Sequence, residues 1–290
     1  ALLCLVIALG GAGAGLWLSA PQSVARESLP AAHVPDLANG ERIYHIGGCI
    51  SCHRPTEASG RDRSLPSGGA PFVTPVGTFY PPNLTPDAET GLGKWSDADF
   101  VTAVQHGVSP TGSHYIPAFP YPSYNRMRVE DVLDLKAYLA SLPAVSAPAQ
   151  PADLRFAWAM GIWNRLALKG PFTPDATQTA SWNRGAYLVN GPGHCAECHT
   201  PRTALMLADA SRAFAGGPHP DGKGKVPSLK GLIAHGEFTD VADLTSALQT
   251  GEDGGYDQLA SGGMSEVQSN IAHLPQDDVA AIAEYLASLK

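Results

Sequence analysis

Hydrophobic residues along much of the chain recur at the spacing of helices. Val132, Leu135, Leu139 and Leu142 lie three or four residues apart within 130–142, which predicts a helix with one apolar face. Strict alternation of apolar and polar residues, the mark of a half-buried strand, is scarce. The pattern therefore predicts an all-α fold.

Polar residues, glycine and proline mark where some of these helices should begin and end. Ser96 followed by Asp99 has the spacing of a capping box, which predicts a helix start, and Gly107 is a suitable stop for the same helix. Pro275 stands where the first residue of the last helix is expected.

The first twenty residues form an apolar run without a charge. As a helix, the 19 residues from Leu2 to Ala20 would be about 28 Å long, close to the thickness of the hydrocarbon core of a bilayer. The rival interpretation is a cleaved signal peptide, whose apolar region is shorter, at about 7–15 residues. We expect residues 1–20 to be a transmembrane anchor in the lipid bilayer and the proline-rich residues 21–36 to be a linker.

A second proline-rich stretch, Pro143 to Pro151, lies near the middle of the chain. The aromatic and aliphatic residues of 155–170 follow it, and they predict one amphipathic helix that ends at Gly170–Pro171. Residues 144–180 are therefore expected to connect two domains.

The chain repeats itself with a period near 146 residues. The pattern Cys-x-x-Cys-His begins at Cys49 and again at Cys195, an offset of 146, and segment 130–142 matches 277–289 at an offset of 147. A repeat this long indicates a duplicated domain, since the units of a solenoid are only about 20–50 residues long. The predicted helical domains are residues 37–143 and 181–290.

Composition narrows the possible functions. Lys and Arg number 19 against 27 Asp and Glu, which gives a net charge of −8 and argues against binding nucleic acid, because phosphates require a basic face. Glycine and proline together make up 56 of the 290 residues, too many for long uninterrupted helices. Such a chain needs something besides regular secondary structure to organise it.

The two Cys-x-x-Cys-His motifs indicate that bound haem organises the chain, because this pattern is the attachment signature of c-type haem. Two thiols one helical turn apart can add to the two vinyl groups of one porphyrin, and the next residue brings an imidazole under the iron. Zinc-binding cysteine pairs are usually separated by about 15–20 residues, far fewer than separate the two motifs here. A thioredoxin-like redox pair needs a βαβ context, which the predicted helical domains lack. We therefore expect two covalently bound haem c groups. The residues expected to carry the thioether bonds are Cys49, Cys52, Cys195 and Cys198.

Covalent haem also predicts a location. Thioether bonds to haem are made in the bacterial periplasm or an equivalent compartment, so residues 21–290 are expected outside the cytoplasm. Together with the anchor, this predicts a single-pass protein of the cell inner membrane with its haem domains in the periplasm.

The proximal iron ligands are expected to be His53 and His199, which directly follow the second cysteine of each motif. The other ring nitrogen of each histidine should donate to a carbonyl or similar acceptor. Pro71 and Pro218 are candidates to supply that carbonyl, with a plain turn role as the alternative for both.

The distal ligands should come from the loop before each final helix. Met264 is the expected ligand of the second haem. In the first unit the repeat offsets project Met264 onto residues 117–120, where no side chain can bind iron, so Met127 is expected, with His114 or His106 as alternatives. An iron held by histidine and methionine is six-coordinate and has no open position for a substrate, which predicts an electron carrier without catalytic residues.

Three segments carry a resemblance to a known family: PPNLTPDAETGLGKWSDADFVTAVQHGVSP, IPAFPYPSY and GPGHCAECHTPR. They resemble the membrane-anchored cytochrome c subunits of periplasmic dehydrogenases, and the resemblance runs from about Gly40 to Lys290. It implies two tandem class I cytochrome c-like domains and a redox protein complex, membrane-bound or periplasmic, as partner. Many alcohol-dehydrogenase cytochromes of this group carry three haems and a methionine where this chain has Phe119.

The resemblance implies transfer of electrons from a periplasmic dehydrogenase or respiratory complex to a quinone, a cytochrome or a terminal oxidase. One alternative is a dihaem enzyme, either a peroxidase, which needs a haem that can open a coordination position, or a thiosulfate dehydrogenase with a cysteine at the iron. Outside residues 1–20, no cysteine remains beyond the two motifs. A dedicated subunit of a terminal oxidase is the other alternative.

Overall fold

The computed structural model describes residues 15, 17–74, 77–150, 153–154, 159–219, 224–253, 257–258 and 263–290. Most of the expected transmembrane segment, residues 1–20, therefore lies outside the described residues. Among the helices that are described, none combines the length and the apolar character needed to cross a membrane.

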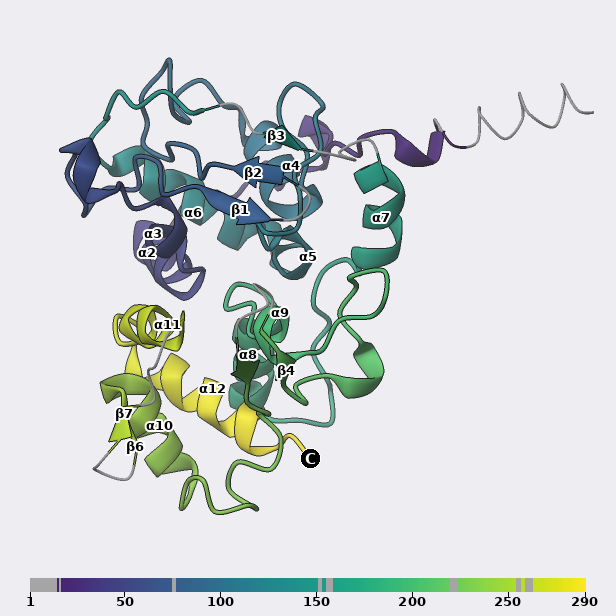
Figure 1. Cartoon of the computed structure of the whole chain (residues 1–290), viewed down its shortest axis with the longest axis vertical. Coiled ribbons are helices and arrows are strands. Elements are labelled where there is room, and N and C mark those ends of the chain that lie inside the picture. Colours follow the sequence, from purple (N-terminus) through teal and green to yellow (C-terminus); the bar gives the residue numbers. More distant parts are fainter. Residues whose placement is uncertain are drawn as a thin grey trace, which may run out of the picture.

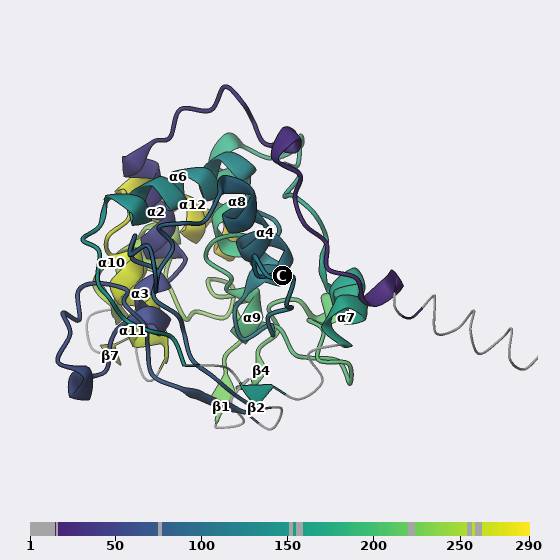
Figure 2. The same ribbon diagram turned by 90° about the horizontal axis from the view of Figure 1, so that it is seen from above.

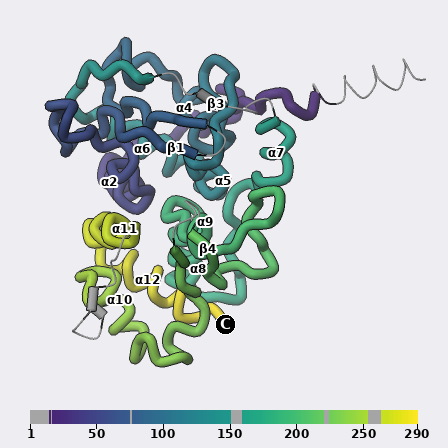
Figure 3. The backbone as a smooth tube through the Cα atoms, viewed as in Figure 1, coloured from purple at the N-terminus to yellow at the C-terminus, as the bar shows by residue number. Residues whose placement is uncertain are grey.

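Most of the described chain forms two helical units, one above the other in Figure 1. Each unit is built on two helices that pack against each other. In the first unit α2 (Leu37–Ile46) packs on α6 (Val129–Ser141), and in the second α8 (Ala180–Asn190) packs on α12 (Gln276–Ala287). Figure 2 shows the same four helices from above, and the tube in Figure 3 follows the chain from the first unit into the second.

Shorter helices complete the two units. The first unit contains α3 (Cys49–His53), α4 (Asp97–His106) and α5 (Tyr121–Tyr124). The second contains α9 (Ala196–His199), α10 (Val241–Thr250) and α11 (Gly263–Ile271). Helix α7 (Met160–Ala167) lies between the two units. The described residues also include 3-10 helices at Arg26–Ser28, Glu57–Ser59 and Ala210–Arg212.

Two glycines allow the paired long helices to come close together. A Cβ atom on Gly40 of α2 would lie 2.1 Å from the carbonyl oxygen of Asp134 in α6. A Cβ on Gly185 of α8 would lie 1.8 Å from the carbonyl oxygen of Ala281 in α12. Because backbone atoms cannot move aside as a flexible side chain can, only glycine fits at these two crossings.

The helix boundaries predicted around segment 98–107 are confirmed. The Ser96 side chain accepts from the backbone N–H of Asp99, the Asp99 carboxylate accepts from that of Ser96, and Gly107 ends the helix with φ of 64°. The repeat preserves this construction, since Asp240 caps α10 and Gly251 ends it with φ of 82°. Pro275, expected as the first residue of the last helix, lies one position earlier, at its N-cap.

Short strands correct the expectation of an all-α chain, although helices predominate. The strands β1 (Phe72–Thr74), β2 (Gly77–Phe79) and β3 (Asp153–Leu154) form one antiparallel sheet, in which Phe72 pairs with Phe79. Two smaller ladders pair β4 (Gly217–Pro218) with β5 (Lys225–Val226) and β6 (Glu252–Asp253) with β7 (Asp257–Gln258). Runs of two or three residues are too short to show the alternation by which a strand is recognised.

The connector helix is shorter than predicted. It ends at Ala167, before Gly170–Pro171, and residues 155–158 of the predicted segment lie outside the described residues. Buried Asn164 joins α7 to the first unit, because its Oδ1 accepts from the Tyr121 hydroxyl at 2.6 Å and its Nδ2 donates to the His106 carbonyl at 3.1 Å.

Candidate haem-binding sites

Both Cys-x-x-Cys-His motifs fold into a short helix. The first forms all of α3, which begins after Gly48 in a left-handed conformation, with φ of 59°. The second has Cys195 at its N-cap and continues as α9. Cysteines three residues apart on a helix lie on one side of it, where both can reach one planar group.

The histidine of each motif is oriented by a proline carbonyl. His53 Nδ1 lies 2.7 Å from the carbonyl oxygen of Pro82, and His199 Nδ1 lies 2.9 Å from that of Pro227. The predicted acceptors, Pro71 and Pro218, are wrong. Pro71 and Pro218 come soon after the glycine pairs of their units. The prolines whose carbonyls contact the histidines lie about ten residues further along the chain.

The sequence repeat could have predicted which prolines supply these carbonyls. Residues 81–84 read Pro-Pro-Asn-Leu and residues 226–229 read Val-Pro-Ser-Leu, so Pro82 and Pro227 are 145 residues apart, close to the offset of the motifs. A proline shared by both copies at a fixed distance from the histidine indicates a shared backbone position.

This hydrogen bond leaves one ring nitrogen of each histidine available to a metal. A carbonyl can only accept, so Nδ1 must carry the hydrogen and Nε2 the lone pair. Burial lowers the pKa of His53 to about 4 and also lowers the pKa of His199, so both rings are neutral near pH 7. A neutral imidazole held by its outer nitrogen is the usual form of an iron ligand, and these residues fit haem c.

The cysteines do not have the features of the rival sites. Burial raises the pKa of Cys49 and of Cys195 to about 12, so both are un-ionised thiols rather than the reactive thiolates of a redox pair. The two cysteine pairs lie in different units, and no three His, Cys, Asp or Glu side chains of the described chain gather as an ion site. The described structure therefore does not form the four-cysteine zinc site.

The two predicted methionine ligands have different surroundings. Met127 is 1% exposed and belongs to the apolar core, and its Cγ is 3.8 Å from the point where a Cβ on Gly191 would lie. Met264 is half-buried and is the second residue of α11, not part of a loop as expected. Ligation of iron by either methionine stays a prediction.

The alternative ligands in the first unit differ, because the ring of His114 makes a hydrogen-bond contact and that of His106 is shown only with a backbone one. His114 Nε2 lies 3.0 Å from the carbonyl oxygen of Ser19, and the backbone carbonyl of His106 accepts from Asn164. Each ring has a buried Nδ1 without a hydrogen-bond partner in the described part of the chain. These two histidines therefore remain alternatives to Met127.

The two motif helices contact the opposite unit in a reciprocal way. Ser123, just before the last helix of the first unit, donates to Glu197 of α9 at 2.7 Å. Asn270, in the matching place of the second unit, donates to Ser51 of α3 at 2.9 Å. The partners are related by the repeat offsets of 147 and 146, so the duplicated units face each other with their motif helices at the contact.

Aromatic rings fill the same contact between the units. The ring centroids of Tyr124 and His194 are 5.7 Å apart, and the Tyr124 hydroxyl donates to the Gly47 carbonyl at 2.7 Å. His45 and His273 stack with their ring centroids 4.2 Å apart. His45 lies four residues before the first motif, and His194 directly precedes the second. Each of them contacts a ring from the opposite unit, His273 and Tyr124 respectively.

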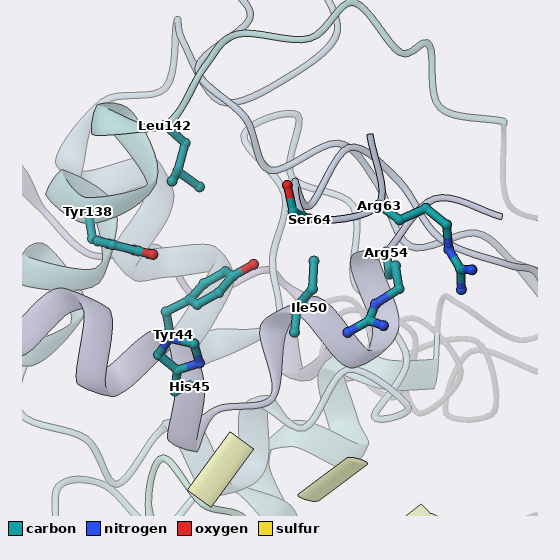
Figure 4. Close-up of a pocket in the computed structure, with 8 residues that line it drawn as sticks. All are labelled: Tyr44, His45, Ile50, Arg54, Arg63, Ser64, Tyr138 and Leu142. Atoms are coloured by element: carbon teal, nitrogen blue, oxygen red, sulfur yellow. The ribbon is translucent and has the colours of Figure 1, made fainter. Parts of the chain in front are cut away.

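A cavity of about 480 Å³ opens beside the first motif helix (Figure 4). It is lined by Tyr44, His45, Ile50, Arg54, Arg63, Ser64, Tyr138 and Leu142. Its lining includes Ile50 of the first motif and Arg54 directly after it, but neither His53 nor Met127.

Comparison with known proteins decides the family. A protein named diheme cytochrome c-type from Cereibacter sphaeroides is 42% identical over 97% of this chain and 95% of its own length. The chain belongs to the cytochrome c family. The cytochrome c family profile matches residues 37–143 of this cytochrome.

Two further relatives of this cytochrome are subunits of larger enzymes. The fructose dehydrogenase cytochrome subunit of Gluconobacter japonicus is 34% identical over 91% of the chain and 54% of its own length. The cytochrome c subunit of the quinone alcohol dehydrogenase of Gluconacetobacter polyoxogenes is 36% identical over 87% and 56%, so the chain spans about half the length of these two subunits. All three relatives are named as cytochromes or cytochrome subunits, which confirms the prediction of an electron-transfer protein rather than an enzyme.

Proposed function

We propose that this cytochrome is a two-haem electron-transfer subunit, built as two tandem class I cytochrome c domains at residues 37–143 and 181–290. The observation that carries the proposal is the repeated geometry in which each Cys-x-x-Cys-His helix ends in a histidine held by a proline carbonyl. The residues that would bind the two haems are Cys49, Cys52, His53 and Met127 in the first domain and Cys195, Cys198, His199 and Met264 in the second.

A bound haem c supplies a reversible one-electron change at its iron. The cysteines would fix each porphyrin covalently, and Pro82 and Pro227 would hold the histidine rings in one tautomer and one orientation. The polar and aromatic contacts between the units would keep the two haems at a constant separation, which electron transfer between them requires.

The electron donor we propose is a dehydrogenase. The support is the naming of two relatives as cytochrome subunits of fructose and quinone alcohol dehydrogenases. A quinone, another cytochrome or a terminal oxidase would accept the electrons. We also propose a periplasmic location, with residues 1–20 as the anchor in the inner membrane, on the strength of their uncharged sequence and of the compartment in which haem c is attached.

Haem counting in three variants tests the proposal. Pyridine haemochrome analysis of the full chain, produced with c-type haem maturation, should give two haems per 30.3 kDa polypeptide. Cys49→Ser with Cys52→Ser should leave one haem, Cys195→Ser with Cys198→Ser should leave the other, and Cys4→Ser is the control that should keep both. One haem in the unaltered protein, or haem extracted by acidic acetone, would contradict the proposal.

A second experiment tests the direction of electron flow. The oxidised protein should be reduced by a dehydrogenase such as the fructose or quinone alcohol dehydrogenases of its relatives when that enzyme receives its substrate, and it should not be reduced by the substrate alone. Reduction by substrate without the enzyme would indicate catalysis at one of the haems.

A further inference from the structure

Exposed apolar side chains gather around α7. Among the described residues, Trp17 is 68% exposed, Leu166 58%, Leu205 62% and Met206 59%, and Ile162 is also exposed. These five residues come from three separate segments, which Figure 1 shows together at one edge of the molecule.

The hydrogen bonds of α7 define which way its apolar residues point. Asn164 points into the protein, where it contacts Tyr121 and His106. At about 100° per residue, Ile162 and Leu166 each lie about 200° around the helix from Asn164. Both therefore point outward, and they share one face because they are four residues apart.

The other two segments border this outward face on its two sides. On one side the Arg165 guanidinium lies 4.9 Å from the centre of the Trp17 ring, and its Nε donates to the Leu18 carbonyl at 3.0 Å. On the other side the Trp163 Nε1 donates to the Leu205 carbonyl at 2.9 Å, which brings Leu205 and Met206 alongside the helix.

The segment that carries Trp17 is held tightly against α7. A Cβ on Gly161 would lie 2.2 Å from the carbonyl oxygen of Ser19, so this close approach requires glycine. His114 contacts the same carbonyl from the first unit. The position of Trp17 relative to Ile162 and Leu166 is therefore fixed by the fold.

The segment of sequence that contains α7 carries a charge opposite to that of the whole chain. Residues 155–170 contain Arg155, Arg165 and Lys169 and no acidic residue, while the chain has a net charge of −8. Tryptophan, exposed aliphatic side chains and basic residues together are typical of a helix that lies in the headgroup region of an anionic bilayer.

We propose that the shelf formed by Trp17, Ile162, Leu166, Leu205 and Met206 rests in the surface of an anionic lipid bilayer. The inference builds on the proposed membrane anchoring, because the chain before Trp17 is the uncharged segment 1–16. Anchor and shelf together would hold the two haem domains in one orientation above the membrane, instead of letting them move freely on the linker.

Spin labelling in vesicles tests this orientation. The full-length, two-haem protein, with Cys4→Ser, is reconstituted into phosphatidylcholine vesicles that contain phosphatidylglycerol. A nitroxide is attached to Leu166→Cys, to Met206→Cys or, as the matched control, to Val73→Cys, which replaces a residue that is 79% exposed on β1. The haems are kept fully oxidised in every sample, and the relaxation caused by the iron is subtracted with a sample that contains neither collision reagent.

The measurement compares collisions with oxygen, which concentrates in lipid, and with a water-soluble nickel chelate. The ratio of the two accessibilities should be several-fold higher at residues 166 and 206 than at residue 73. Equal ratios at the three positions in protein that floats with the vesicles would overturn the shelf and leave the anchor standing. Failure of the unlabelled protein to float would overturn the anchor and the shelf together.

Discussion

At the scale of single residues, the two proposed methionine ligands differ in how much packing depends on them. Met127 is fully buried and precedes the last helix of its unit by two residues. The residue 147 positions later is Leu274, also buried in the core and unable to bind iron. Packing alone can therefore account for a large apolar residue at this position, so a test of Met127 must separate its sulfur from its volume.

Met127→Leu makes that separation. A volume-conserving swap in a core costs under about 1.5 kcal/mol of the free energy of unfolding, whereas Met127→Ala should cost about 2–5 kcal/mol. If Met127 binds iron, the leucine variant should keep the fold, lose the weak absorption band near 695 nm of the first haem and lower its reduction potential. An unchanged first-haem spectrum in Met127→Leu would transfer the role to His114 or His106.

Met264→Ala should change the second haem with a smaller effect on folding, because Met264 is half-buried in the first turn of α11. Loss of the thioether opens the sixth position, so the variant should become high-spin or water-ligated, bind carbon monoxide and have a lower potential at this haem. Optical titration checks it, with Met206→Ala as the control, since Met206 is 59% exposed. A variant with the unaltered spectrum would exclude Met264 as a ligand.

At the scale of elements, each unit depends on one close crossing of two helices. Gly40 of α2 and Gly185 of α8 occupy the same position in the repeat, and each faces a backbone carbonyl of the opposite helix. The crossing brings each motif helix into place, because α3 and α9 follow shortly after α2 and α8.

Gly40→Ala and Gly185→Ala should each destabilise the protein by about 1–3 kcal/mol, since the added methyl group overlaps backbone atoms and forces the helices apart. Gly263→Ala is the control, because a Cβ there meets nothing within 4 Å. Denaturant unfolding of the haem-loaded protein measures the differences. Loss of stability in the control equal to that in the two variants would contradict the close-crossing explanation.

At the scale of the whole molecule, the two units are joined by contacts that include buried charge. Burial alone would raise the pKa of Asp131, but hydrogen bonds from Arg128, from the Tyr187 hydroxyl and from Asn39 hold that pKa below its usual range. Tyr187 belongs to the second unit, so this carboxylate links the units as well as the helices of the first.

The stacked histidines make this contact between units sensitive to pH. Burial and the nearby His273 lower the pKa of His45, against the opposing effects of Glu41 and Asn270. The pKa of a histidine in the unfolded chain is about 6.5, so between the two pKa values the unfolded chain binds more protons. The stability supplied by neutral His45 is therefore present above about pH 6.5 and is lost as pH falls through the lowered pKa.

Thermal unfolding between about pH 8 and pH 5 checks this dependence. The unaltered protein should lose melting temperature on acidification, and His45→Gln should lose less, because its side chain cannot be protonated. His235→Gln, which replaces an exposed histidine, should retain the full dependence. The same pH dependence in His45→Gln as in the unaltered protein would show that other groups cause it.

The sequence by itself determined that helices predominate, and it predicted the residues that would attach haem. Both depend on local rules: helices follow from the spacing of apolar residues and from caps such as Ser96, and thioether attachment depends on two cysteines and a histidine within five consecutive residues. The family comparison agrees with the electron-transfer function that these motifs predict.

Only the tertiary structure decided which distant atoms meet. The carbonyl that orients His53 comes from Pro82, 29 residues away, and the partner of Ser51 is Asn270, 219 residues away. Spacing along the chain carries little information about such pairs, since they depend on how loops return and how the units pack. The apolar surface around α7 has the same origin, because Trp17, Leu166 and Leu205 become neighbours only after the chain has folded.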